Sequence, residues 1–193
     1  MKDKGKTDEE ISIMVQQGDT EAFGVLVDRY ESKIKRYARK SVSDREDISD
    51  LVQDVFIKAY TNIKSFNAER RFSPWIYRIA HNEFVNGLKK KLSDKLFPFD
   101  FDLLFPHPVA EETADSDAHK KELKHMMDKS IGTLSPKYRE PLVLYYYEEM
   151  DYKEIAGILE IPTSTVGVRI NRGKAILKNI IQELDQQSYG KRT

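Results

Sequence analysis

The chain contains no cysteine among its 193 residues, which excludes a disulfide framework and a thiolate metal site. It also has no net charge, because 32 basic residues balance 32 acidic ones, and this excludes a uniformly basic coat for nucleic acid. No apolar run approaches the roughly 18 residues needed to span a bilayer. The first ten residues are polar where a signal peptide would become apolar. These absences predict a soluble, cytoplasmic protein that does not insert into a membrane, with basic and acidic surfaces confined to patches.

Strand signals are missing as well, since no segment alternates β-branched and polar residues. Helix starts are frequent: capping boxes or a cap with a first-turn proline occur at Thr7–Glu10, Ser43–Glu46, Ser73-Pro74 and Ser135-Pro136. We therefore expect an all-α chain made of two small helical domains. The domains are expected in residues 1–92 and 119–193, the second ending in a polar tail, with an extended linker in 93–118.

Residues 48–60 carry two patterns at once. Apolar residues recur at helical spacing on one side, at Ile48, Leu51, Val52, Val55, Phe56, Ala59 and Tyr60. The opposite face presents Asp50, Gln53, Asp54 and Lys58. We expect the apolar side to pack in the first domain and the polar side to bind a basic, helical partner.

The linker differs in composition from both domains. Prolines at Pro98, Pro106 and Pro108 break any long helix there, and phenylalanines are interspersed with acidic residues. Because the segment has aromatic residues and no glycine, it is not a generic flexible spacer. Two roles stay open: a spacer whose aromatic rings pack on neighbouring helices, or an acidic strap that occupies a groove in a partner.

The spacing in residues 151–184 predicts a helix-turn-helix. A first helix of about 151–159, expected to bury Ile155, Ala156 and Leu159, is followed by a turn and a second helix that starts at Pro162-Thr163. Residues 161–182 contain no acidic residue, while basic side chains stand at Arg169, Arg172, Lys174 and Lys178. A basic amphipathic helix with a polar start suits the major groove, with Ser164, Thr165, Val168 and Arg169 near the bases. A plain helical hairpin with a solvated charged face is the alternative.

A polar loop rich in cations and aromatic rings precedes a helix expected from Trp75 to about Lys91. The loop carries Lys64, Phe66, Arg70, Arg71 and Phe72, and Arg78 and Asn82 share a helix face with Trp75. Rings that stack on unpaired bases and cations that meet phosphates are what single-stranded DNA requires. Taken alone, Trp75 would more often be a core anchor, and Asn82 a polar surface residue.

Four segments give the chain a resemblance to the extracytoplasmic-function (ECF) group of RNA polymerase sigma factors. They are Gln17–Phe23 with Leu26–Tyr30, Asp47–Phe56, Phe72–Asn82, and Leu134–Glu140 with Tyr152–Ala156 and Thr165-Val166. In this order and spacing they are specific, and the resemblance covers about residues 8–186 apart from the linker. It implies an alternative sigma factor without cofactor or enzymatic activity. Such a factor directs bacterial core RNA polymerase to promoters through domains called σ2 and σ4.

The resemblance also implies a role for each site. The polar face of 48–60 would dock on the clamp helices of the largest polymerase subunit. The loop Lys64–Phe72 would hold a base extruded from the −10 promoter element, and Trp75, Arg78 and Asn82 would hold the melted strand. The helix-turn-helix would recognise the −35 element as duplex. An anti-sigma factor, often anchored in a membrane, is a further expected partner.

Four residues depart from the family pattern. Gly167 replaces a basic residue, Gly173 an alanine, His81 an arginine, and Pro141 stands where a helix former is expected. Two glycines in a helix cost roughly 1 kcal/mol each against alanine. Whether they weaken the helix, bend it or allow a closer approach to DNA stays open.

Other classes of protein remain as alternatives. A stand-alone helix-turn-helix regulator would explain residues 134–184, but not the polar face of 48–60 or the Trp75 segment. A helical adaptor without a DNA role would leave the acid-free segment 161–182 unexplained. An enzyme is not expected, because no set of polar residues converges and the four histidines lack metal-ligand spacing.

Overall fold

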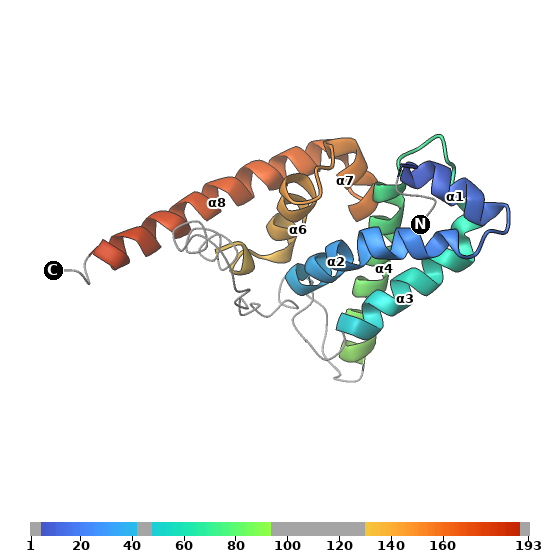
Figure 1. The fold of residues 1–193 in the computed structure, drawn as a ribbon. Helices are drawn as coiled ribbons and strands as arrows, with labels where there is room; N and C mark the ends of the chain where they lie inside the picture. Colours follow the sequence, from blue (N-terminus) through green and yellow to red (C-terminus); the bar gives the residue numbers. More distant parts are fainter. Residues whose placement is uncertain (1–4, 42–47, 94–129, 190–193) are drawn as a thin grey trace.

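The computed structural model describes residues 5–41, 48–93 and 130–189 (Figure 1). Over these ranges the chain forms helices and short connections and no β-strand, which confirms the all-α class. The predicted capping box at Ser43–Glu46 and the linker 93–118, apart from the first residue of the linker, lie outside the described residues. In the described part, no helix is long and apolar enough to cross a membrane, and no three potential metal ligands gather.

The first module contains four α-helices and a short 3-10 helix. They are α1 (Asp8–Gln16), α2 (Ala22–Ser41), α3 (Ile48–Asn62), η1 (Ile63–Ser65) and α4 (Phe72–Ser93). The predicted capping box at Thr7 is present, with Thr7 accepting from the Glu10 backbone N–H. The module is built around buried residues from all four α-helices, among them Ile11, Leu26, Val55, Ile76 and Tyr77.

Helix α4 begins earlier than the sequence predicts, at Phe72 rather than Trp75. The backbone N–H of Phe72 donates to Glu9 Oε1 at 2.9 Å, so a side chain from α1 satisfies one of the free donors at this helix start. Ser73-Pro74 therefore lies in the first turn and is not the cap. The acceptor is distant in sequence, which is why the local pattern placed the start three residues too late.

The second module contains α6 (Pro136–Tyr146), α7 (Tyr152–Leu159) and α8 (Thr163–Tyr189). Asp151 caps α7 in a capping box with Glu154, and Glu160 ends it in the left-handed conformation, with φ of 53°. Helix α7 buries Ile155 and Ile158, whereas Ala156 and Leu159, expected to be buried, are only partly covered. Pro141 lies inside α6 and is buried.

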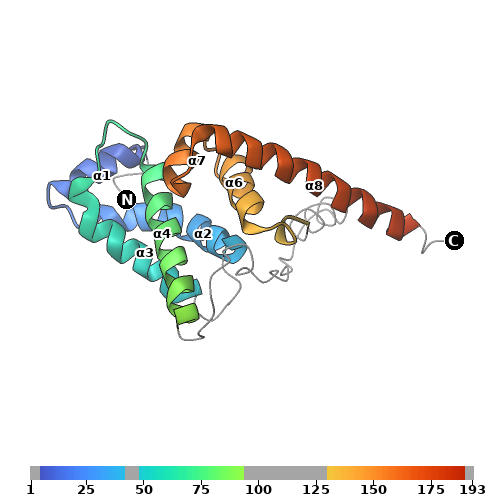
Figure 2. The same cartoon turned by 180° about the vertical axis from the view of Figure 1, so that it is seen from behind.

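The two modules pack against each other. Helix α7 lies against α4 and helix α6 against α2, while α8 extends away from the first module (Figures 1 and 2). One hydrophobic cluster contains residues from both modules. The sequence predicts two modules, but their packing places α7 over the segment expected to bind single-stranded DNA.

Candidate functional site

The polar face of α3 lies in solvent, as its pattern predicts. Asp50, Gln53, Asp54 and Lys58 are all exposed, and Lys58 pairs with Glu83 of α4. Two large apolar side chains join this face: Ile57 is 51% exposed and Tyr60, predicted to face inward, is 41% exposed. The sequence signal for Ile57 was its position next to Lys58, outside the apolar stripe. The face therefore combines charge with apolar surface, as a protein-binding surface does.

Aromatic rings hold Trp75 at the start of α4. The Trp75 ring centroid lies 5.2 Å from that of Phe66 and 5.4 Å from that of Phe72. Phe72 is fully buried and Phe66 is 5% exposed. Both rings pack against the half-buried Trp75 and fix its orientation. Direct contact of these two residues with DNA stays a prediction.

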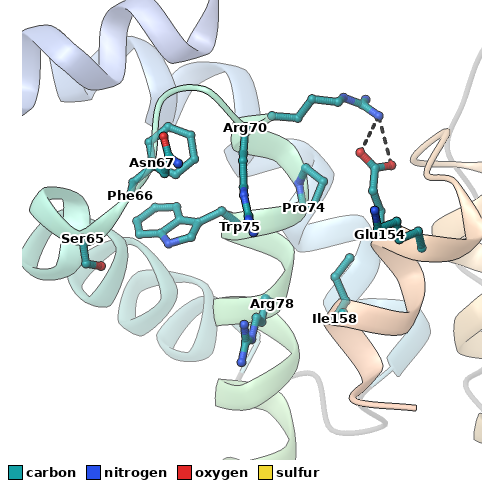
Figure 3. A pocket seen from close by; sticks show the side chains of 12 residues that line it. Ser65, Phe66, Asn67, Arg70, Pro74, Trp75, Arg78, Glu154 and Ile158 are labelled. Carbon is teal, nitrogen blue, oxygen red and sulfur yellow. Dashed lines mark hydrogen bonds and ion pairs between the residues drawn. The ribbon is translucent and has the colours of Figure 1, made fainter. Parts of the chain in front are cut away.

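A cavity of about 600 Å³ opens above Trp75, between the two modules. The loop and α4 supply one wall, with Phe66, Trp75 and the cations Arg70 and Arg78, and α7 supplies the facing wall, with Glu154 and Ile158 (Figure 3). Lys64 and Asn82 are exposed, but neither lines this cavity. The cavity thus brings aromatic and cationic residues of the predicted −10 site together with residues that the sequence assigned to another module.

Two cations at this cavity already have carboxylate partners from the second module. Arg71 Nη1 lies 2.8 Å from Glu154 Oε1 and 3.0 Å from Glu154 Oε2. Arg78 Nη2 lies 3.4 Å from Glu160 Oε1, in a more exposed pair. Sequence reasoning missed both glutamates, because no local pattern links them to residues some 80 positions earlier.

A buried polar network joins the modules beneath this surface. Glu148 accepts from Arg36 at 2.6 Å and from the Tyr77 hydroxyl. Burial, together with the charge and hydrogen bond of Glu148, raises the pKa of Tyr77 above its ordinary value, so its hydroxyl keeps its proton and donates. Only 3% of the Glu148 side chain is exposed, so this carboxylate depends on its partners for stability.

A second carboxylate, that of Glu140, explains the departure at His81. The ring of His81 lies with Nδ1 2.8 Å from Glu140 Oε1, which also accepts from the Tyr37 hydroxyl. Burial opposes protonation of His81, but the hydrogen bond and charge of Glu140 and the charge of Glu160 outweigh it and raise the pKa of His81. His81 therefore forms part of the contact between modules.

Helix α8 exposes most of the residues that the sequence predicts to contact duplex DNA. Ser164, Val168, Arg172, Lys174 and Lys178 are exposed, and Thr165 and Arg169 are partly exposed. Among the side chains that the structure describes, which on α8 end at Gln182, no carboxylate forms an ion pair with the four cations of α8. This face keeps its positive charges available for phosphates.

The two departing glycines of α8 are packing residues. A Cβ on Gly173 would lie 2.7 Å from Leu142 Cδ1 and 3.3 Å from the Tyr138 carbonyl oxygen, so glycine permits the close crossing of α6 and α8. A Cβ on Gly167 would lie 3.3 Å from the Tyr152 ring of α7. Both positions face neighbouring helices.

The fold and these surfaces define a helical DNA-binding protein of two modules. Residues 26–93 match Sigma-70 region 2, and residues 124–177 match Sigma-70, region 4. The ECF RNA polymerase sigma factor SigW of Bacillus subtilis is 35% identical over 178 residues, which cover 88% of this chain and 94% of that protein. The chain therefore belongs to the ECF family of sigma factors and is an alternative sigma factor, which directs RNA polymerase to promoters. The resemblance seen in the sequence is confirmed.

Solved structures share the fold. CnrH, solved in complex with the cytosolic domain of CnrY, superposes with a TM-score of 0.67 at 23% identity, over 92% of this chain and 99% of that chain. The sigma factor RpoE of Bartonella quintana, solved with the anti-sigma factor NepR, superposes with a TM-score of 0.65 at 21% identity, over 83% of this chain and 96% of that chain. The two-module helical architecture is thus common to this chain and these relatives.

Proposed function

We propose a division of labour in which each of the three surfaces described above serves one step of promoter recognition. The exposed face of α3 docks on core RNA polymerase through Asp50, Gln53, Asp54 and Lys58. The domain boundaries proposed from the sequence, 1–92, 93–118 and 119–193, keep this face and Trp75 in one module, while α7 of the other module supplies the facing wall of the pocket. The observation that carries the proposal is the presence of two separate cationic surfaces in one sigma-family chain, a pocket beside Trp75 and an exposed face of α8.

The Trp75 pocket takes the melted −10 strand in this proposal. A ring that is held from below and open on one side suits stacking with an unpaired base, and the surrounding cations suit its phosphates. Trp75, Arg78 and Asn82 hold the strand, while Lys64, Arg70 and Arg71 contact the backbone. Phe66 and Phe72 act through Trp75.

Helix α8 takes the −35 element as duplex. Base contacts come from Ser164, Thr165, Val168 and Arg169 near the start of the helix, and phosphate contacts come from Arg169, Arg172, Lys174 and Lys178. Because the phosphate contacts displace counterions, affinity falls steeply with salt.

We further propose that the chain acts in the cytoplasm through binding, without enzymatic activity, and that an anti-sigma factor restrains it. The RpoE relative captured with NepR supports the last point.

Transcription by purified bacterial core polymerase tests the proposal. A library of promoter fragments is transcribed with and without the protein, and start sites that depend on the protein are expected, with shared −35 and −10 sequences upstream. Duplex binding by the protein alone, without any new start sites, would instead favour the stand-alone helix-turn-helix regulator.

The docking face is tested with Asp54→Ala. Loss of this exposed carboxylate is expected to weaken binding to core polymerase severalfold without changing the helical circular dichroism, because the side chain lies at the surface and outside the core. Asp28→Ala, an equally exposed change on α2, is the control. Equal polymerase affinity for the two variants would move the docking surface elsewhere.

A further inference from the structure

Helix α7 and the residue that ends it place carboxylates on the cations of the Trp75 pocket. Glu154 contacts Arg71 through both oxygens, at 2.8 and 3.0 Å, and its side chain is 15% exposed. Glu160 lies 3.4 Å from Arg78. A carboxylate and a phosphate oxygen offer a guanidinium the same kind of charge-assisted hydrogen bond. The second module thus occupies these cations with the same chemistry that a DNA backbone would bring.

We propose that α7 competes with the melted strand for the Trp75 pocket. In the closed arrangement, in which α7 packs against α4, the chain is therefore autoinhibited at the −10 site and not at the −35 site. This inference rests on the proposed function of the Trp75 pocket. In the closed arrangement Glu154 and Glu160 stand in for strand phosphates on Arg71 and Arg78. Strand binding therefore requires α7 to leave.

The placement of Glu160 supports a dedicated contact. This residue ends α7 with φ of 53°, a left-handed conformation that favours glycine over residues with a side chain. The chain carries a glutamate there, and its carboxylate faces Arg78 from the other module. Glu154 likewise has two roles, since it completes the capping box of α7 while it binds Arg71.

The closed arrangement has its own anchors away from the pocket. Glu148 binds Arg36 and Tyr77, and Glu140 binds Tyr37 and His81. Each of these two carboxylates of the second module is thus hydrogen-bonded to residues of the first. Separation of the two modules would expose these carboxylates to water and remove them from their hydrogen-bond partners. The fraction of open molecules sets the apparent strand affinity, because binding is weakened by the fraction that is competent.

The composition supplies a direct reporter of opening. Trp75 is the only tryptophan of the chain and lines the cavity between the modules, so its access to a neutral quencher such as acrylamide measures whether α7 covers it. The chain also lacks cysteine, so two introduced cysteines can carry a fluorescent pair across the interface. Both measurements are independent of DNA.

The experiment compares the full chain with Glu154→Gln/Glu160→Gln. Glutamine keeps the capping box, so α7 stays folded while both ion pairs lose their charge. The control is Glu21→Gln/Glu31→Gln, which also removes two negative charges, at exposed positions just before α2 and in the middle of it. The probes are a single-stranded oligonucleotide of randomised sequence and a duplex of the same composition.

The expected result has three parts. Relative to the control, the double variant binds the single strand about five- to tenfold more tightly, as two surface ion pairs allow. Acrylamide quenches Trp75 more strongly in this variant. Duplex affinity is equal in both variants, because the ion pairs of Glu154 and Glu160 are with Arg71 and Arg78 and not with a cation of α8.

Two outcomes would overturn the inference, and they differ. Equal single-strand affinity in both variants, with binding measurable in each, refutes competition by α7 and leaves the proposed function of the pocket intact. Absence of single-strand binding in the wild type and in the double variant, despite stronger quenching of Trp75, refutes the proposed function of the pocket itself and the competition with it.

Discussion

The two DNA-type surfaces of this chain have similar chemistry but different availability. At the Trp75 pocket, Arg71 and Arg78 face carboxylates of the second module. On α8, Arg172 and Lys174 are exposed, and no carboxylate pairs with them among the side chains that the structure describes. The sequence can thus predict that a cation binds DNA, but tertiary packing decides whether that cation pairs with a carboxylate or stays exposed.

The origin of each surface explains the difference. The α8 face lies on one helix, so helical periodicity alone places its side chains together. The pocket is built from η1, the following loop, α4 and α7, segments up to 90 residues apart. The packing that builds the pocket from several segments also covers part of it. The α8 face belongs to one helix, and no neighbouring segment is needed to form it.

The largest expected effect comes from the anchor of the closed arrangement. Glu148→Ala leaves Arg36 and the buried Tyr77 hydroxyl without their acceptor, and we expect it to lower the free energy of unfolding by about 3 kcal/mol. Denaturant unfolding followed by circular dichroism measures this loss. Glu31→Ala, which breaks the exposed pair with Lys35, is the control and should cost under about 0.5 kcal/mol. Similar losses in both variants would show that Glu148 does not hold the modules together.

The second-largest expected effect concerns the close crossing of α6 and α8 at Gly173. Gly173→Val forces a branched side chain against Leu142 and the Tyr138 backbone, and we expect a loss of about 2 kcal/mol in unfolding free energy. Gly157→Ala on α7 is the matched change, because its Cβ would meet nothing within 4 Å, and it should stabilise by about 0.5–1 kcal/mol. If both variants shift stability in the same direction, the tight crossing of α6 and α8 is not what requires glycine.

A smaller effect separates the two surfaces by ligand. Arg172→Ala should weaken duplex binding severalfold and reduce the slope of log affinity against log salt by about 1, as expected when one phosphate contact is lost. Arg71→Ala should leave duplex binding unchanged, since Arg71 faces the pocket. Fluorescence anisotropy over a salt series measures both. An unchanged slope for Arg172→Ala would remove this residue from the duplex surface.

The smallest effect is a pH dependence of the contact between modules. The pKa of His81 is raised in the closed arrangement, so the protonated ring stabilises it. This contribution is fully present below the ordinary histidine pKa of about 6.5 and is lost as the pH rises through the raised pKa. Acrylamide quenching of Trp75 should therefore increase with pH. His81→Gln should remove this dependence, and an unaltered pH profile in that variant would assign the titration to another group.

Part of the site was predictable because its signals are local. The exposed face of α3 follows from the 3.6-residue period, and the basic face of α8 follows from the absence of acidic residues in 161–182. Phe66 and Phe72 were not predictable in the same way, because an aromatic residue in a polar loop can point to solvent or to the core. Their burial depends on the packing of Phe72 against Tyr30 and Phe66, which no local pattern encodes.

Sequence alone determined that this chain is all-α, that it has two modules, and that it belongs among the sigma factors, because caps, periodicity and motifs are properties of neighbouring residues. Only the tertiary structure decided which of those residues face one another. The pairs Arg71–Glu154, Arg36–Glu148 and His81–Glu140 each join positions 59 to 112 residues apart. Such contacts depend on how two apolar faces dock, and this docking is set by shape and burial across the whole molecule.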